Sequence, residues 1–366
     1  MSDIVISGYH GFANSGDEAL LFAILNTLRK KKPSLSFTVL SKKPEETAEV
    51  YSVNSINRYN FLKIKKEMKK SKMLLFGGGS LLQDVTSSKS IRYYLAIIRL
   101  AQKVGLKTML YANGIGPIVK DKNRKKASKI LNEVDFITLR DDKSDEELKS
   151  LGVTKPRVII TADPAFTIDT DTTRSGKFFT NIAGVPSGTK LCIVSIREWK
   201  NSSPYFKSDL AKLCDRMVEN HSIYPLFVPM QYPEDTEISK AVMTLMKNPS
   251  YIISRELSVP EMFSVLSEAE VLIGMRLHSL IYATTLAIPA LPICYDPKIS
   301  AFMESLNQPD RVDIETFDYA KAEKLLNTII LEKEARHEDL KKTNAILRKT
   351  AEKNAEYAIE LLESGN

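Results

Sequence analysis

Cysteine is scarce in this chain: Cys192, Cys214 and Cys294 are the only three among 366 residues. Three scattered thiols are too few for a disulfide framework or a zinc cluster, so we expect buried thiols in a reducing cytosol. The first residues, MSDIVISG, lack the basic and apolar regions of a secretory signal peptide. Apolar runs of about 18 residues, the length that crosses a membrane, are also missing. The sequence therefore predicts a protein that is neither secreted nor embedded in a bilayer.

Histidine is nearly as rare, with four residues. His10, His221 and His337 have no further ligand at metal-binding spacing, so no metal site is expected. No G-x-S-x-G or Cys-His arrangement indicates covalent catalysis. The glycines of VISGYHGFANSGDEALLFAIL, residues 5–25, match neither the dinucleotide fingerprint G-x-G-x-x-G nor a P-loop, because no Lys-Ser or Lys-Thr pair follows them.

Positive charge is in moderate excess, at +7 from 52 Lys and Arg against 45 Asp and Glu. Residues 63–72, KIKKEMKKSK, contain six lysines and one glutamate. Such a run can attract nucleic acid, an anionic membrane surface or a diphosphate head group, although a solvated helix face is its commoner role. Because no aromatic residue interleaves with the lysines, nucleic acid is not an expected partner.

Short apolar runs alternate with helical patterns along the first half, which is typical of a parallel sheet covered on both faces. The predicted strands are residues 3–7, 36–40, 73–76, 108–111, 136–139 and 158–161. The predicted helices between them are residues 18–31, 90–104, 122–133 and 143–151. A segment rich in Thr, Ser and Gly, residues 171–190, breaks this rhythm as a linker region would.

The alternation restarts after that segment. Strands are predicted at residues 191–195, 224–228, 251–254, 271–274 and 290–294, and helices at 208–220, 234–246, 259–268 and 279–286. Residues 319–362 are helical and highly charged. We therefore predict an α/β fold of two doubly wound Rossmann-like domains facing a cleft, residues 1–170 and 191–335, followed by a helical tail, residues 336–366. The carboxyl ends of the strands would line that cleft.

Three glycine-bearing loops follow predicted strands of the first domain. Residues 8–18 end at a helix start, where unbonded N–H groups favour an anion. The structural alternative is that Asp17 only caps this helix, whereas a carboxylate here could also orient a sugar hydroxyl. FGGGSLLQD, residues 76–84, lets the backbone approach a ligand closely, and ANGIGP, residues 112–117, follows the next strand. Together the three loops predict a binding cleft.

Basic side chains follow strands of both domains. Arg140 comes after FITL, Arg197 after CIVSI, Arg276 and His278 after VLIGM, and Lys298 after the last strand, in CYDPKIS. A guanidinium can grip a carboxylate or phosphate through two hydrogen bonds, and an imidazole at a helix start can bind an anion or exchange a proton. Each residue alone is more often part of a surface salt bridge. Their repeated position at strand ends predicts a site for a small, multiply charged anion.

The ordered set of motifs resembles the polysaccharide pyruvyl transferases, most closely the CsaB type that modifies secondary cell wall polymers. The matching pieces run from Gly8 to about Leu306: GYHGFANSGDEA, FGGGSLLQD, NGIGP, TADPAF, SIREW, IGMRLHSLIYA and YDPKI. RLHS with YDPKI downstream is the most specific pair. The helical region after Leu306 carries no matching motif.

This resemblance implies a two-domain fold like that of the B-type glycosyltransferases, and no cofactor. It implies phosphoenolpyruvate as the donor substrate and a lipid-diphosphate-linked disaccharide containing N-acetylmannosamine as the acceptor. The product would be a pyruvate ketal, which S-layer homology domains recognise in the wall of Gram-positive bacteria. The enzyme would be cytoplasmic, working peripherally at the inner face of the cell membrane.

The family's functional Arg, His and Lys fall on Arg276, His278 and Lys298. We expect Arg276 and Lys298 to bind the anionic donor, and His278 either to bind its phosphate or to donate the proton. Asp17 is the preferred base for the attacking hydroxyl, with Glu18 and Asp84 as alternatives. The other expected substrate-binding residues are Arg140, as a further donor contact, together with Arg197, Leu277, Ser279, Asn14 and Gly114, and, on the acceptor side, Gly16, Glu18, Gly78, Gly79 and Ser80.

Two other functions stay open at the level of sequence. A glycosyltransferase of the same architecture would use the strand-end arginines to hold the diphosphate of a nucleotide sugar. A protein without catalytic activity could bind polymer or lipid precursor through the lysine run, residues 63–72, which in an enzyme could dock the lipid diphosphate. The exact acceptor and the oligomeric state are not fixed by the sequence.

Overall fold

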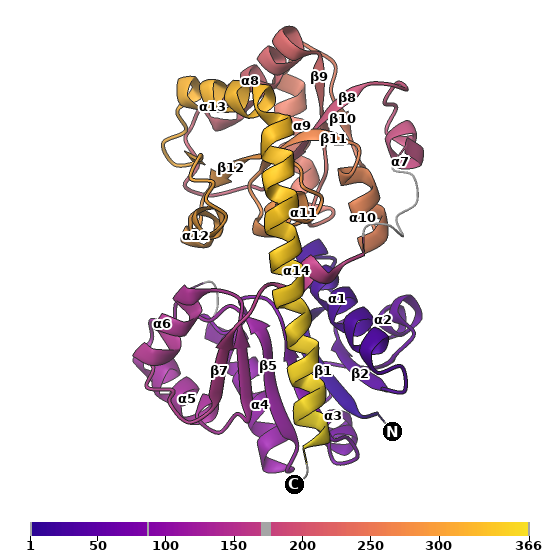
Figure 1. Ribbon diagram of the computed structural model, residues 1–366, viewed down its shortest axis with the longest axis vertical. Coiled ribbons are helices and arrows are strands. Elements are labelled where there is room, and N and C mark those ends of the chain that lie inside the picture. Colours follow the sequence, from indigo (N-terminus) through magenta and orange to yellow (C-terminus); the bar gives the residue numbers. More distant parts are fainter. Residues whose placement is uncertain (1, 86–87, 170–176, 365–366) are drawn as a thin grey trace. The chain divides into compact units, whose positions relative to one another are not determined.

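The chain divides into two compact units in the computed structural model, which describes residues 2–85, 88–169 and 177–364 (Figure 1). Unit 1 consists of Met1–Ile168 and Leu347–Asn366, and unit 2 is Asp169–Ile346. Each unit is built around its own parallel sheet. The predicted α/β class, with two doubly wound Rossmann-like units, is confirmed.

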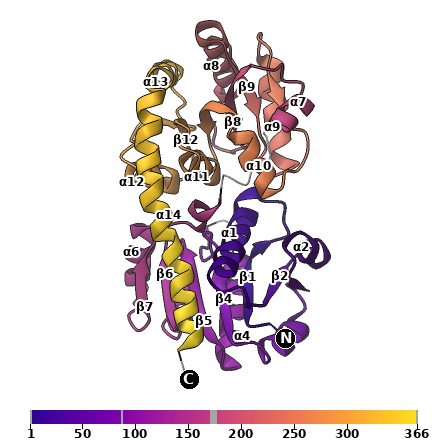
Figure 2. The ribbon, with the colours of Figure 1, turned by 45° about the vertical axis from the view of Figure 1, so that its right-hand side comes forward.

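Seven parallel strands form the described sheet of unit 1, in the order β3-β2-β1-β4-β5-β6-β7. They are β1 (Ile4–His10), β2 (Phe37–Ser41), β3 (Asn54–Asn57), β4 (Met73–Gly77), β5 (Lys107–Asn113), β6 (Phe136–Leu139) and β7 (Arg157–Ile160). Figure 2 shows β1 between β2 and β4, and Ile4 of β1 lies opposite Met73 of β4. Strands covered on both faces are apolar throughout, and this is the feature that predicts them from sequence.

Helices cover both faces of this sheet. One face packs against α3 (Phe61–Met68), α4 (Ser88–Lys103), α5 (Asp121–Leu131) and α6 (Asp142–Ser150), through a core that includes Phe76 and Tyr94. The other face packs against α1 (Ser15–Lys31) and the end of α14 (Lys333–Glu363), through Ile24 and Ala355. The short helices α2 (Pro44–Tyr51) and η1 (Pro164–Thr167) lie against β3 and α1 respectively.

The described sheet of unit 2 has six parallel strands, in the order β10-β9-β8-β11-β12-β13. They are β8 (Lys190–Ser195), β9 (Ile223–Phe227), β10 (Tyr251–Ile252), β11 (Ala269–Gly274), β12 (Ala290–Cys294) and β13 (Val312–Asp313). The helices of this unit are α7 (Lys177–Ile182), α8 (Phe206–His221), α9 (Glu234–Leu245), α10 (Val259–Leu266), α11 (Leu277–Thr285), α12 (Pro297–Ser305) and α13 (Tyr319–Leu331). Its main core joins α8, α9 and α13 to the strands.

Helix α14 is shared by both units. It begins at Lys333, three positions before the predicted tail, and its residues up to Ile346 belong to unit 2, while those from Leu347 onward belong to unit 1. In unit 1, Ala355 and Ala358 of α14 are fully buried in the core. Within the described residues, no helix combines the length and apolar composition needed to cross a membrane.

Several elements were not expected from the sequence. The edge strand β3 reads NSIN and is polar, and β13 has two residues, so neither has the apolar run of a buried strand. Helix α3 coincides with the first part of the lysine run, and α2 precedes it. In the predicted linker region, residues 171–176 lie outside the described residues, and Lys177–Ile182 forms α7.

Candidate active site

Each sheet has one point where the strand order reverses. In unit 1 it lies between β1 and β4, and in unit 2 between β8 and β11. Ligands of doubly wound sheets bind outside the carboxyl ends of the strands at such a point. The loops that follow these strands and their neighbours define two candidate surfaces, edge 1 in unit 1 (residues 8–18, 77–84, 113–117 and 140) and edge 2 in unit 2 (residues 196–199, 275–279 and 295–298).

The glycine turn of edge 1 leads into α1. Asn14 is the N-cap: its Oδ1 accepts the N–H of Gly16 at 3.0 Å and that of Asp17 at 3.3 Å. The alternative in which Asp17 caps the helix is therefore wrong, because α1 begins at Ser15 rather than Glu18. Asp17 is half-buried, and a Cβ placed on Gly79 would lie 3.3 Å from its Oδ1, so this carboxylate faces the loop after β4.

Glu18 holds the glycine turn in shape. One carboxylate oxygen accepts the N–H of Gly11 at 2.8 Å, and the other accepts the Tyr51 hydroxyl at 2.7 Å. Both oxygens are thus engaged within the fold. The structure places Glu18 at the expected position but gives it a structural role.

Arg58 lies under the same turn and has no signature in the sequence. It is 4% exposed, its Nη1 donates to the Gly8 carbonyl at 3.0 Å, and its guanidinium is surrounded by five aromatic rings: Tyr9, Phe12, Tyr59, Tyr93 and Tyr94. Burial, together with the nearby Arg58 charge, lowers the pKa of His10 to about 3. His10 is therefore neutral at physiological pH, and cation–π contacts hold the turn in place.

The loops after β4, β5 and β6 form one hydrogen-bonded network in edge 1. Arg140 donates to Ser80 Oγ at 2.7 Å and to the Asp163 carboxylate at 2.8 Å, and its side chain is 7% exposed. A Cβ on Gly114 would lie 2.4 Å from Ser80 Oγ, so only glycine fits there. Gly114 N–H donates to the Gly79 carbonyl at 2.9 Å. Arg140, expected as a donor contact, and Ser80, expected on the acceptor side, thus contact each other, and Asp163 pairs with Arg140.

Asp84, an alternative base, lies apart from the turn around Asp17. Burial raises the pKa of its carboxyl, but hydrogen bonds from Asn123, Val119 and Lys120 outweigh burial, so the pKa lies below its usual value. Asp84 is 3% exposed and fixes the start of α5. A buried carboxylate with three donors is poorly suited to accept a proton from a substrate.

In edge 2, Arg276 precedes the first residue of α11 and is paired inside unit 2. Its Nε and Nη2 donate to the two carboxylate oxygens of Asp235, at 2.7 and 2.5 Å, and Nη2 also contacts Gln231 at 3.2 Å. The Asp235 side chain is 2% exposed and that of Arg276 12%. This bidentate pair leaves Nη1 of Arg276 without a hydrogen bond among the described residues. The sequence did not identify Asp235, which lies 41 positions away.

Arg197 follows β8, the neighbour of β11 across the reversal of strand order. It makes no ion pair within the described part of the chain. Its Nη1 lies 3.4 Å from the Tyr295 hydroxyl, and the guanidinium lies 5.3 Å from the centre of that ring. Trp199 packs on the same tyrosine, and two buried donors, Nε of Arg197 and Nε1 of Trp199, have no hydrogen-bond acceptor among the described residues. Edge 2 therefore contains a cation and an indole N–H that can bind an anion.

The other expected residues of edge 2 lie at the starts of two helices. Leu277 is the first residue of α11, His278 the second, and both are half-buried. Ser279 is fully buried, and its hydroxyl donates to the Arg276 carbonyl at 2.6 Å, so it shapes the helix start instead of facing a ligand. Lys298 is half-buried in the first turn of α12, where its N–H donates to the N-cap Asp296 at 2.9 Å. The first N–H groups of a helix favour a bound anion.

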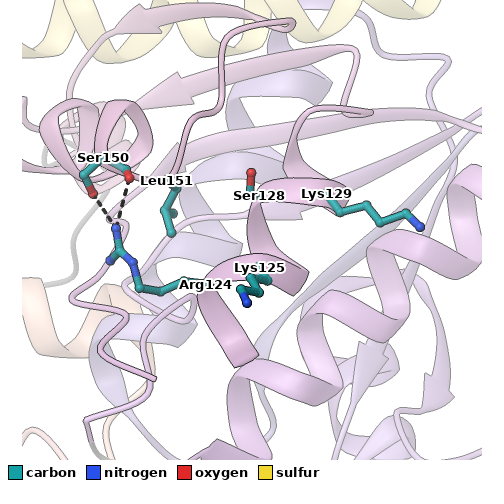
Figure 3. A pocket seen from close by; sticks show the side chains of 6 residues that line it. All are labelled: Arg124, Lys125, Ser128, Lys129, Ser150 and Leu151. Atoms are coloured by element: carbon teal, nitrogen blue, oxygen red, sulfur yellow. Dashed lines mark hydrogen bonds between the residues drawn. The ribbon is translucent and has the colours of Figure 1, made fainter. Parts of the chain in front are cut away.

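A surface pocket of about 360 Å³ lies elsewhere, on α5 and the end of α6 (Figure 3). Arg124 lines it and donates to the carbonyl and hydroxyl of Ser150, at 3.1 and 3.0 Å. This pocket belongs to neither edge. Among the described residues, no group of three or more His, Cys, Asp and Glu side chains is arranged to hold a metal ion.

Several solved structures with the same fold were determined with UDP or a UDP-sugar bound. The chain is similar to HepE of Anabaena in complex with UDP-glucose, with 10% identity, full coverage of both chains and a TM-score of 0.67. It is also similar to the UDP-GlcNAc 2-epimerase of Neisseria meningitidis, with 12% identity, coverage of 99% and 100%, and a TM-score of 0.64. At these identities the likeness shows the fold alone, which is of the B-type glycosyltransferase class.

Sequence comparison is more specific. The amylovoran biosynthesis protein AmsJ of Erwinia amylovora is 20% identical over 363 residues, covering 84% of this chain and 86% of that protein. The polysaccharide pyruvyl transferase pattern matches residues 14–297, which include most of both edges but not residues 8–13 or Lys298. The chain therefore belongs to the polysaccharide pyruvyl transferase family and is a transferase with a pyruvyl-transfer role in polysaccharide biosynthesis.

Proposed function

We propose that this transferase takes pyruvate from phosphoenolpyruvate and attaches it as a ketal to an N-acetylmannosamine residue of a lipid-diphosphate-linked disaccharide. It would be of the CsaB type, acting at the cytoplasmic face of the membrane in secondary cell wall polymer synthesis and S-layer anchoring. The observation that carries the donor assignment is the Arg197 guanidinium in edge 2, which makes no ion pair with any described residue and lies beside the strand that leads into α11.

Phosphoenolpyruvate has a carboxylate and a phosphate, and edge 2 offers donors for both. Arg197 and the indole of Trp199 would bind one anionic group, while Lys298 and the start of α11 at His278 would bind the other. Arg276 would contribute only its Nη1, because Asp235 engages the other two nitrogens. In this proposal Arg276 mainly fixes the loop before α11, a smaller role than the sequence suggested.

Ketal formation joins one phosphoenolpyruvate to two hydroxyls of one sugar and releases one phosphate. The methylene carbon accepts a proton, a sugar hydroxyl attacks the adjacent carbon, phosphate leaves with its bonding electrons, and the second hydroxyl closes the ring. His278 would donate the proton or bind the leaving phosphate. Asp17, facing Gly79 in edge 1, would accept the proton of the attacking hydroxyl. The oxocarbenium-like charge would be stabilised by fixed groups around it.

The acceptor would bind at edge 1. Gly78 and Gly79 have positive φ angles of 60° and 73°, a conformation that favours glycine, and they bring the loop after β4 against Leu20 and Asp17 of α1. Asn14 and Glu18 are occupied within the fold and would keep the turn in shape for Asp17. Arg140 is likewise engaged with Asp163, which favours a positioning role for it over direct donor binding.

The first experiment measures phosphate release from phosphoenolpyruvate with and without a synthetic lipid-diphosphate disaccharide containing N-acetylmannosamine, and the mass of the acceptor afterwards. We expect acceptor-dependent release and a pyruvate ketal on the sugar. Arg197→Ala should raise KM for phosphoenolpyruvate at least about tenfold, the loss of one charged contact. Arg216→Ala, an exposed arginine of the same unit, is the matched control.

A nucleotide-sugar glycosyltransferase is the competing function, because the solved structures above hold UDP or UDP-sugars. Ligands that bind the folded state raise its melting temperature. Protection by phosphoenolpyruvate and not by UDP supports our proposal. Protection by UDP together with no ketal product would replace it with the competing function.

A further inference from the structure

Helix α3 and the turn before it expose apolar and cationic side chains side by side. Tyr59 is 55% exposed, Phe61 44% and Leu62 84%. The lysines of residues 63–70 follow directly and are all exposed. We define this group, Tyr59, Phe61, Leu62 and the lysines of residues 63–70, as the α3 surface; its helix is labelled in Figure 1.

The inner face of α3 fixes which side chains point outward. Ile64 and Met68, four positions apart, are fully buried in the core of unit 1. Helical periodicity then places Leu62, Lys66 and Lys69 on the opposite side, towards solvent. An apolar side chain thus lies at the amino-terminal end of a cationic outer stripe, an arrangement that the core does not require.

The charge of this surface is unusually one-sided. Glu67, the one acidic residue of the run, is turned inward and accepts hydrogen bonds from the hydroxyls of Ser2 and Thr38. Lys72, the last lysine, pairs with Asp3. Within the described residues, none of the lysines between positions 63 and 70 makes an ion pair. The neighbouring helix α4 carries four basic residues and no acidic one.

The apolar residues are held in place from behind. The Tyr93 ring packs edge-on against Tyr59 and against Phe61, each at 6.1 Å between ring centres. The Tyr93 hydroxyl donates to the Arg58 carbonyl at 3.0 Å, and Arg58 in turn donates to the Gly8 carbonyl of the glycine turn. The α3 surface is therefore pre-ordered and adjoins edge 1.

We propose that the α3 surface docks unit 1 onto an anionic lipid bilayer, with Leu62 and Phe61 inserted at the level of the head groups and the lysines contacting lipid phosphates. Exposed Phe and Leu beside a cluster of lysines are the composition of interfacial helices. A polyanion such as nucleic acid would use the lysines but gains nothing from Leu62. The proposal stands without the pyruvyl reaction, because vesicle binding requires neither donor nor acceptor.

Sedimentation with vesicles tests the surface in the full chain. Binding is expected to vesicles of two parts phosphatidylcholine and one part phosphatidylglycerol, and to weaken with salt and with pure phosphatidylcholine. Replacing Lys65, Lys66 and Lys69 by Gln should lower the affinity by about a hundredfold, at a factor of several per lysine. The same change at Lys341, Lys342 and Lys349 of α14, all exposed, should leave it unaltered.

A second measurement isolates the apolar contribution. Leu62→Ser should lower vesicle affinity by about tenfold, and Leu331→Ser, at 79% exposed, is the matched control. Because the three native cysteines are buried, Leu62→Cys can carry an environment-sensitive dye whose emission should shift to the blue on anionic vesicles. Unchanged vesicle binding in both the lysine and the Leu62 variants, or RNA binding that needs the lysines while vesicles are ignored, would overturn the proposal.

Discussion

Arg276 and Asp235 illustrate how a buried charge in this protein depends on one partner. The two side chains share a bidentate contact that solvent barely reaches. Asp235→Asn removes the negative charge and leaves the guanidinium buried, which should lower the free energy of unfolding by about 3 kcal/mol. Glu219→Gln, which breaks the exposed pair with Arg216, should have a much smaller effect, because solvent screens that pair. Equal losses in urea titrations of the two variants would contradict this assignment.

His10 predicts a dependence of stability on pH. In the folded state the pKa of His10 is about 3, against 6.5 for an exposed histidine. Between these two pH values His10 is therefore protonated in the unfolded chain and neutral in the folded chain. Stability is then fully present above pH 6.5 and is lost as the pH falls towards 3. Between pH 6.5 and 4 this amounts to about 3 kcal/mol. His10→Gln should reduce that loss in denaturant titrations, and an identical pH profile in both proteins would count against it.

The sequence predicts where the arginines of the candidate site lie, but not which residues they contact. The positions of Arg140, Arg197 and Arg276 after strands could be predicted, because apolar runs mark the strands. Their partners could not, since Asp163 and Asp235 lie 23 and 41 positions away, and only the folded sheet brings them together. Arg197 differs from the other two because no described carboxylate pairs with it, a distinction that composition does not reveal.

At the scale of elements, the start of α1 can be tested through its cap. Asn14→Ala removes the acceptor of the Gly16 and Asp17 N–H groups and should lower the free energy of unfolding by about 1 kcal/mol. Asn14→Ser keeps a capping oxygen and should retain most of that stability. Calorimetry of the three proteins measures the difference. A serine variant as unstable as the alanine variant would mean that Asn14 acts through another contact.

Strands were predicted well where burial on both faces makes them apolar, as in β4 and β5. All of β4 is buried, and so are the residues of β5 from Thr108 to Asn113. The edge strand β3 was not predicted, because its sequence NSIN is mostly polar. Hydrogen bonding to β2 on one side stabilises it as a strand. The predicted start of the first helix, residue 18, lies three positions after the actual start of α1 at Ser15. Ser15 and Gly16 have little intrinsic helical preference, and the helix begins there because Asn14 caps it. Local composition thus predicts the centre of each unit better than its rim.

On the scale of the whole molecule, α14 stabilises both units through separate polar contacts. Asn354 is fully buried and bonds the Thr161 hydroxyl at 2.8 Å and the Ala162 carbonyl at 3.2 Å in unit 1. Asn354→Ala should lower the free energy of unfolding of unit 1 by about 2 kcal/mol, because it leaves the buried Thr161 hydroxyl and Ala162 carbonyl without this hydrogen-bond partner. Hydrogen exchange should report the loss at β6 and β7.

The matched change is Asn344→Ala on the same helix, which removes a bond to the Thr285 carbonyl in unit 2. Exchange should then increase around α11 and not around β6. If both variants loosened the same amides, α14 would transmit strain along its length, and the two halves of the helix could not be treated as separate contributions.

The way α14 closes unit 1 has a consequence for synthesis on the ribosome. Unit 2 is one unbroken stretch, Asp169–Ile346, whereas unit 1 combines one segment translated before unit 2 with another translated after it. Ala355 and Ala358, which fill the core of unit 1, are translated after the whole of unit 2. Domains of a nascent chain usually fold in the order in which they emerge. Here the unit whose strands are translated first becomes complete only after unit 2 has been translated, because its core needs the last turns of α14.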